Sequence, residues 1–251
     1  MQKLNYPKPT ETAFPNDSKC PICNYFDPTH PDVIRIIKAR DPTMRLMIQA
    51  QCKCPRREQE VEAANERRRL QANVPHAQRP RTFARWQHAP ETTDAFNAAY
   101  EFAQGKGPHV LVLSGGFGLG KSHLLEAIVR FNLDQNCSTR YEFTSSFLDR
   151  LRHSYDDDSE QDLFALLEWY QRMNLLVLDD LGVEKSTEWG REKLTMVVDE
   201  RLRDGRRLAI GTNLGKEQLS QNLGPRMASR LFPEHGDEEV AVAYLAGKDR
   251  R

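Results

Sequence analysis

The sequence predicts an α/β fold in which a parallel sheet is flanked by helices, with a small cysteine-rich module ahead of it. Short apolar runs alternate with helix-like segments from about residue 92 onward, which is typical of a parallel sheet covered on both faces. A glycine-rich loop separates the first apolar run from the next helix-like segment. Four of the five cysteines lie between Cys20 and Cys54, ahead of this alternation.

The bulk composition limits the class of protein. The 251 residues allow one large domain, or one medium domain with a small module. Lys+Arg and Asp+Glu are equal at 36 each, so the net charge does not indicate a nucleic-acid partner. No apolar stretch approaches the roughly 20 residues that span a bilayer, and the N-terminus lacks the apolar core of a signal peptide. We expect a cytoplasmic protein with no membrane partner and reduced thiols.

Four segments are predicted along the chain. Residues 1–19 are polar and proline-rich and are expected to be disordered. Residues 20–60 hold the cysteine module, and residues 61–80 form a helical linker. The charged helix of this region is expected over residues 56–71, before two prolines break it. Residues 81–251 form the α/β domain, which shows no internal repeat.

The elements of the α/β domain follow in order. "HVLVLS" and "LLVLDD" are typical of short buried strands, and "TRYEFTSS" and "RLAIGTN" complete the set. The helix expected over residues 92–105 stops at Gly105, and the helix expected over residues 122–135 is amphipathic. The predicted strands cover residues 109–114, 139–146, 175–180 and 207–213, and the predicted helices cover residues 92–105, 122–135, 147–155, 162–173 and 190–205.

The glycine-rich loop fits the phosphate-binding P-loop pattern in full: Gly115, four residues, Gly120, Lys121 and Ser122. Glycines let the backbone turn tightly, so that successive N–H groups face one anion. The helix that begins near Lys121 adds its positive dipole end. A flexible glycine turn is the alternative, and the strand before the loop and the helix after it argue against that.

Nucleotide and magnesium contacts follow from this pattern. The Lys121 ammonium is expected to reach the β- and γ-phosphates, and the Ser122 hydroxyl to ligate Mg²⁺. Nothing in the loop distinguishes adenine from guanine. The predicted nucleotide-binding residues of the loop are Gly115, Gly116, Phe117, Gly118, Leu119, Gly120, Lys121, Ser122 and His123.

Polar residues at the ends of two later strands complete the predicted site. Asp179 is expected to serve Mg²⁺ and Asp180 to polarise the attacking water, because ligands in such sheets bind beyond the carboxyl ends of the strands. Two turn acids are the alternative. Asn213 follows the next strand and could contact the γ-phosphate or the water, unless it forms an Asx turn.

Two arginines lie four residues apart in "GPRMASRL". Arg226 and Arg230 therefore share one helical face. Arginine matches a transition-state phosphoryl group as a finger supplied in trans. Ordinary surface arginines are the alternative.

These motifs, at these distances, resemble the AAA+ ATPases of the bacterial and phage helicase-loader group, DnaC-like and DnaI-like, which share their core with IstB. The P-loop, "LLVLDDLG", "GTNL" and "MASRL" carry the resemblance, which spans roughly residues 72–251. "NVPHAQRPRTFARW" is similar to the family's entry segment. "LAGKDRR" resembles the chain end of these loaders, so no C-terminal lid domain is expected.

The resemblance implies ATP as the nucleotide and a role for each site residue. Asp180 departs from the glutamate found in many AAA+ proteins, so slow turnover is expected. The implied roles are Walker A for Lys121 and Ser122, Walker B for Asp179 and Asp180, sensor 1 for Asn213, arginine finger for Arg230, and an interface position close to the nucleotide for Arg226.

The cysteine cluster predicts a structural zinc site. A CxxC and a CxC pair supply four thiolates with no open position, which suits Zn²⁺. Metal would stabilise a module too small to build much core. His30 is an alternate ligand, Cys137 stands apart, and unrelated thiols or a redox pair are the alternatives. The predicted ligands are Cys20, Cys23, Cys52 and Cys54.

The function implied by the resemblance is that of an ATP-dependent replication protein. It would oligomerise on ATP and DNA, bind the hexameric replicative helicase through the zinc module and help load it onto single-stranded DNA. Hydrolysis would favour release. The alternatives are an IstB-type transposition ATPase on duplex DNA and a metal-stapled adaptor with a vestigial ATPase. The cysteine module favours the loader over the transposition ATPase. The intact Walker residues argue against a vestigial ATPase.

Overall fold

The computed structural model describes six stretches of the chain. The chain divides into two compact units, Met1–Arg67 and Arg68–Arg251, and almost all described residues belong to the second. The cysteine cluster and the segment expected to be disordered lie outside the described residues. The described stretches are residues 65–75, 79–156, 160–182, 187–234 and 238–247, with residue 249.

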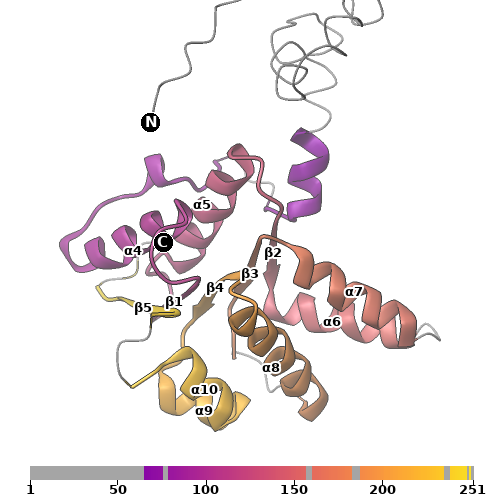
Figure 1. Cartoon of the computed structure of the whole chain (residues 1–251). Helices are drawn as coiled ribbons and strands as arrows, with labels where there is room; N and C mark the ends of the chain where they lie inside the picture. Colours follow the sequence, from indigo (N-terminus) through magenta and orange to yellow (C-terminus); the bar gives the residue numbers. More distant parts are fainter. Residues whose placement is uncertain are drawn as a thin grey trace, which may run out of the picture. The chain divides into compact units, whose positions relative to one another are not determined.

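The second unit is built on a five-stranded sheet with the strand order β2-β3-β4-β1-β5, and every neighbouring pair is parallel (Figure 1). The predicted parallel sheet is confirmed. The strands are β1 (Val110–Gly115), β2 (Thr139–Phe143), β3 (Leu175–Asp179), β4 (Arg207–Thr212) and β5 (Val240–Leu245).

Helices precede the strands and connect them. The five helices predicted for the α/β domain are present within a few residues of their expected ends. The helices are α4 (Thr93–Ala103), α5 (Lys121–Asp134), α6 (Thr144–Asp156), α7 (Glu160–Arg172), α8 (Glu188–Arg203), α9 (Lys216–Leu223) and α10 (Pro225–Leu231), with short 3-10 turns at η3 (Phe83–Arg85) and η4 (Pro90–Thr92).

One junction and two elements differ most from the sequence prediction. The strand expected over residues 139–146 was too long, because β2 ends at Phe143 and α6 begins at Thr144. The "TSS" that follows Phe143 suits a helix start, since serine and threonine favour that position over a strand interior. Strand β5 and helix α9 were not predicted.

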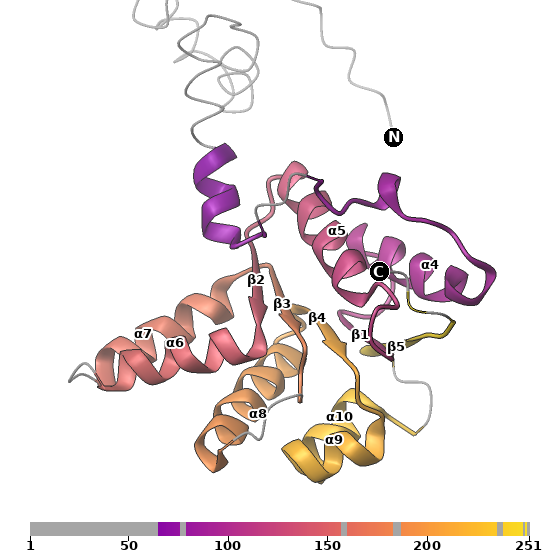
Figure 2. The same ribbon diagram turned by 180° about the vertical axis from the view of Figure 1, so that it is seen from behind.

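The sheet has a hydrophobic core on each face. Val110 and Val112 of β1 pack with α6, α7, α8, α9 and α10, whereas Leu111 and Leu113 pack with α4 and α5. Figure 2 shows these two helical layers from behind. Side chains alternate along each strand, so the continuous apolar runs of the sequence serve both cores.

The parallel arrangement positions the site. Ser114 of β1 lies beside Thr212 of β4, and Leu178 of β3 lies beside Ile210 of β4. The loops that follow these three strands therefore emerge at the same edge of the sheet. Among the described residues, no helix combines the length and apolar character needed to cross a membrane.

Candidate nucleotide-binding site

The glycine-rich loop joins β1 to α5 in a conformation that requires glycine. Gly118 and Gly120 have φ angles of 72° and 100°, in the region that side-chain-bearing residues rarely adopt. A Cβ atom at Gly120 would lie 2.6 Å from the ring of Trp86. The loop is therefore built for backbone exposure and close packing, as a phosphate cradle requires.

A cavity of about 710 Å³ lies against this loop. It brings together eight of the predicted site residues, from three separate loops and the start of α5. The lining also carries three cationic side chains against one carboxylate, a balance that favours an anionic ligand. The lining residues are Arg81, Arg85, Trp86, Gln87, Phe117, Gly118, Gly120, Lys121, Ser122, His123, Asp180 and Asn213.

Lys121 is nearly buried, with 5% of its surface exposed. Its ammonium donates hydrogen bonds to the carbonyl oxygens of Gly115 and Gly116, at 2.8 and 2.6 Å. Gly115, Gly116 and Leu119 belong to the loop without lining the cavity. The charge of Lys121 is thus held by the loop itself, and Lys121 lines the cavity.

The two aspartates at the end of β3 differ in burial and in their contact with the cavity. Asp179 is fully buried and accepts a hydrogen bond from the backbone N–H of Asp180 on Oδ1, at 2.9 Å. Asp180 has a φ angle of 56° and lines the cavity. The left-handed turn at Asp180 therefore presents one carboxylate to the cavity and leaves the other behind it.

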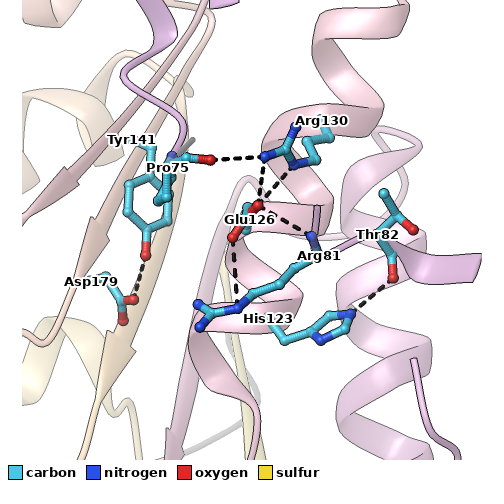
Figure 3. A network of polar contacts seen from close by, with 8 residues as sticks. All are labelled: Pro75, Arg81, Thr82, His123, Glu126, Arg130, Tyr141 and Asp179. Carbon is cyan, nitrogen blue, oxygen red and sulfur yellow. Dashed lines mark hydrogen bonds and ion pairs between the residues drawn. The ribbon is translucent and has the colours of Figure 1, made fainter. Parts of the chain in front are cut away.

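Tyr141 on β2 contacts the buried aspartate, and sequence reasoning missed it. Its hydroxyl donates to Oδ2 of Asp179 at 2.6 Å (Figure 3). Burial and the negative charge of Asp179 raise the pKa of the Tyr141 phenol far above its usual range, so the phenol stays a proton donor. In the sequence, an aromatic residue in a strand gives no signal beyond core packing.

Thr212 and Asn213, at the end of β4, have different contacts. The hydroxyl of buried Thr212 donates to the carbonyl of Leu181 at 2.8 Å and accepts from the N–H of Leu214 at 3.1 Å. Asn213 lines the cavity, close to the loop after β3. Thr212 thus fixes the two loops to each other while Asn213 is available to a ligand.

The segment before α4 forms another wall of the cavity, which the sequence did not predict. Arg81, Arg85, Trp86 and Gln87 all belong to it. A signal was present, because "NVPHAQRPRTFARW" resembles the family's entry segment and carries a tryptophan in a polar stretch.

Helix α5 anchors this segment. Nε2 of His123 lies 2.9 Å from the carbonyl oxygen of Thr82 (Figure 3). Buried Glu126 accepts from the backbone N–H of Arg81 at 3.2 Å and pairs with Arg130 at 2.7 Å. The cavity wall is therefore attached to the helix that starts at the P-loop.

Arg226 and Arg230 on α10 do not line the cavity. Both pair with Asp199 of α8, at 2.5 Å for Arg226 and 2.7 Å for Arg230. The Arg226 side chain is 67% exposed and that of Arg230 is 38% exposed. One carboxylate thus holds both arginines on the surface of the same chain.

The residues present fit a magnesium nucleotide. The glycine conformations, the cationic lining and the Ser122, Asp179 and Asp180 oxygens at one edge of the sheet are the groups that such a ligand needs. Within the described stretches, no cluster of three or more histidine, cysteine or acidic residues could hold a metal by itself. The four cysteines of the predicted zinc site lie outside the described residues.

A parallel sheet with a P-loop at its carboxyl edge defines the class of P-loop nucleotide-binding proteins. Residues 78–234 match the family described as the bacterial DnaA ATPase domain, and the chain belongs to this family. Membership implies nucleotide binding and ATPase activity of the AAA+ type.

The curated relatives include a helicase loader. The replicative helicase loader DnaI of Bacillus subtilis (strain 168) is 28% identical over 168 residues, which cover 66% of this chain and 49% of the loader. The chain spans about half or less of the length of the curated relatives it matches first. The resemblance to DnaC/DnaI-like AAA+ loaders that the motifs carry is confirmed.

Solved structures share the fold. The DnaC helicase loader aligns with a TM-score of 0.58 at 21% identity, over 66% of this chain and 97% of that one. A DnaA bound to AMPPCP and single-stranded DNA aligns with a TM-score of 0.60 at 16% identity, over 70% and 53%. At these identities the likeness establishes the fold and leaves the activity to other arguments.

Proposed function

We propose that this chain is an ATP-dependent replication protein that binds the hexameric replicative helicase and helps to load it onto single-stranded DNA. Family membership supports a role in replication initiation or helicase loading. The observation that carries the proposal is the cavity, because Lys121, Ser122, Asp180 and Asn213 from three loops line it together. An ATPase switch needs these groups at one place.

ATP binding is assigned to the P-loop. The N–H groups of the loop and the N-terminus of α5 would hold the phosphates. The Lys121 ammonium would leave the carbonyls of Gly115 and Gly116, since a phosphate is the stronger partner for a cation. Ser122 and Asp179 would hold Mg²⁺, which neutralises charge on the phosphates when it is bound.

Hydrolysis is assigned to the other side of the cavity. Asp180 would accept a hydrogen bond from the attacking water and polarise it, and Asn213 would orient that water or the γ-phosphate. Because aspartate is shorter than the glutamate common in AAA+ proteins, turnover is expected to be slow. A slow ATPase suits a protein whose nucleotide state acts as a switch.

Assembly is assigned to Arg230. An exposed arginine outside its own cavity can complete a neighbour's site, and arginine fingers act in this way. Arg226 would lie near the same interface. On assembly, Arg230 would leave its ion pair with Asp199 and bind the phosphates of the ATP held by the next subunit.

Helicase attachment is assigned to the cysteine module. Cys20, Cys23, Cys52 and Cys54 would hold one Zn²⁺ as four thiolates, and the metal would fold a segment with little core of its own. Zinc analysis of the full chain tests this, with one metal per chain expected. No zinc in protein purified without chelator would refute it.

A loading assay tests the proposal as a whole. The hexameric helicase is mixed with circular single-stranded DNA, with and without this chain and ATP, and the DNA-bound helicase is counted. The proposal predicts more bound helicase with the chain and ATP, and no gain with the Lys121→Ala chain. An equal count with and without the wild-type chain would contradict it.

A further inference from the structure

The Asp179 carboxylate is enclosed by groups from three neighbouring strands. The hydroxyl of Tyr141, from β2, donates to Oδ2 at 2.6 Å (Figure 3). The N–H of Asp180 donates to Oδ1 at 2.9 Å. On the β4 side, a Cβ atom at Gly211 would lie 2.4 Å from Oδ1, so only a glycine leaves room for the carboxylate. Each carboxylate oxygen thus has one protein donor.

Tyr141 is itself held firmly. It is 1% exposed, and in the register of β2 against β3 it lies beside Val177, two residues before Asp179. Its carbonyl oxygen accepts from the side-chain amide of Asn73 at 3.0 Å, on the outer edge of β2. Thr144, three residues after Tyr141, donates its hydroxyl to the carbonyl of Asp179 at 2.9 Å. Backbone and side chain of Asp179 are therefore both fixed from β2 and the start of α6.

We propose that Tyr141 is a positioning residue for the magnesium carboxylate: its hydroxyl fixes the orientation in which Asp179 meets Mg²⁺. This inference rests on the proposed function. The N–H of Asp180 constrains Oδ1 alone, so Tyr141 is the side chain that stops the buried carboxylate from rotating. Without the hydroxyl, part of the metal's binding free energy is spent on ordering the Asp179 carboxylate.

The chain supplies a matched control. Tyr170 is also fully buried, and its hydroxyl donates to the buried carboxylate of Glu142 at 2.8 Å. Glu142 is paired with Arg140 and does not line the cavity. Tyr141→Phe and Tyr170→Phe therefore remove the same kind of hydrogen bond, and only the first bond ends on a proposed magnesium ligand.

The experiment measures the affinity of the full chain for ATP by equilibrium titration, with Mg²⁺ and with EDTA. The ratio of the two affinities is the magnesium contribution. Tyr141→Phe is expected to lower this ratio roughly tenfold, the scale of one hydrogen bond to a charged group. Affinity in EDTA is expected to stay unchanged, which also shows that the variant is folded. Tyr170→Phe is expected to keep the wild-type ratio.

A double-mutant cycle tests whether the Tyr141 hydroxyl acts through the Asp179 carboxylate. In the Asp179→Asn background, Tyr141→Phe should cause no further loss of the magnesium contribution, because the hydroxyl acts through that carboxylate. A wild-type ratio in Tyr141→Phe, or an equal loss in Tyr170→Phe, would overturn the inference. A wild-type chain that binds no ATP in either condition would overturn the proposed function as well, so the two failures are distinguishable.

Discussion

The ammonium of Lys121 is nearly buried and bound by carbonyl oxygens of its own loop. Neutral carbonyls stabilise a buried cation less than an anionic phosphate does. A triphosphate in the cavity would therefore draw the ammonium away from Gly115 and Gly116. This exchange makes Lys121 the residue on which nucleotide affinity depends most.

Replacement of Lys121 by alanine is expected to weaken ATP binding by at least about tenfold, since hydrogen bonds to charged groups contribute about 1.5–3 kcal/mol. Equilibrium titration with ATP measures the change. Lys216→Ala serves as the control, because this lysine pairs with Glu234 on the surface. Normal ATP affinity in Lys121→Ala would show that the loop is not a phosphate site.

Asp180 has a left-handed backbone, which suits aspartate better than the glutamate found at this position in many AAA+ proteins. At a φ angle of 56°, aspartate and asparagine are tolerated better than longer side chains. Asp180→Asn keeps both shape and backbone preference but removes the charge that polarises water. ATP affinity should therefore persist, while the hydrolysis rate falls by roughly 100-fold, as for loss of a general base. An unchanged single-turnover rate would remove Asp180 from the mechanism.

Helix α8 is tied to its neighbours by one fully buried arginine. Arg201 donates to the carbonyls of Tyr170, Met173 and Arg207, at 2.9, 2.8 and 2.7 Å. Burial, with the nearby charge of Arg206, lowers the pKa of Arg201 to about 9. The guanidinium is therefore still charged at neutral pH, and it donates hydrogen bonds to carbonyls at the end of α7 and the start of β4.

Arg201→Met is expected to destabilise the fold by about 3–5 kcal/mol, because several buried carbonyls lose their donor. Urea unfolding followed by circular dichroism measures this. Arg203→Met, on the same helix but with a 72% exposed side chain, should change stability by no more than about 0.5 kcal/mol. Similar unfolding midpoints for the two variants would mean that the buried contacts contribute little.

The elements differ in how far the sequence predicts them. Continuous apolar runs and the P-loop spacing predict β1, β3 and β4 and the helix after the loop, because buried strands and phosphate cradles tolerate few other residue types. Strand β5 was missed because it lies at the sheet edge and carries an exposed tyrosine, Tyr244. The Tyr141–Asp179 contact could not be predicted, since it depends on the register between two strands.

A mixture of two variants, Arg230→Ala and Lys121→Ala, tests whether Arg230 acts on the site of a neighbouring subunit. Arg230→Ala should bind ATP but hydrolyse it slowly, and Lys121→Ala should bind ATP at least about tenfold more weakly than the wild-type chain. In an equimolar mixture, Lys121→Ala subunits can lend Arg230 to intact sites on Arg230→Ala subunits. Random mixing at head-to-tail interfaces predicts recovery of about a quarter of wild-type ATPase activity. A mixture no more active than its separate parts would exclude Arg230 as a finger in trans.

The two units of the chain have different proposed tasks. The unit from Arg68 to Arg251 carries the nucleotide cavity, and the proposed helicase contact lies in the unit from Met1 to Arg67. The nucleotide state can control the helicase only if both act in one complex. A loader therefore has to form discrete assemblies with its helicase, and an ATPase with another partner does not.

Native mass spectrometry of the full, zinc-loaded chain mixed with the hexameric replicative helicase tests this claim most directly, with and without ATP. The account predicts discrete complexes that carry several copies of this chain per helicase hexamer, with a population that depends on ATP. The contradicting result is a chain that binds ATP but forms no complex with the helicase in either condition.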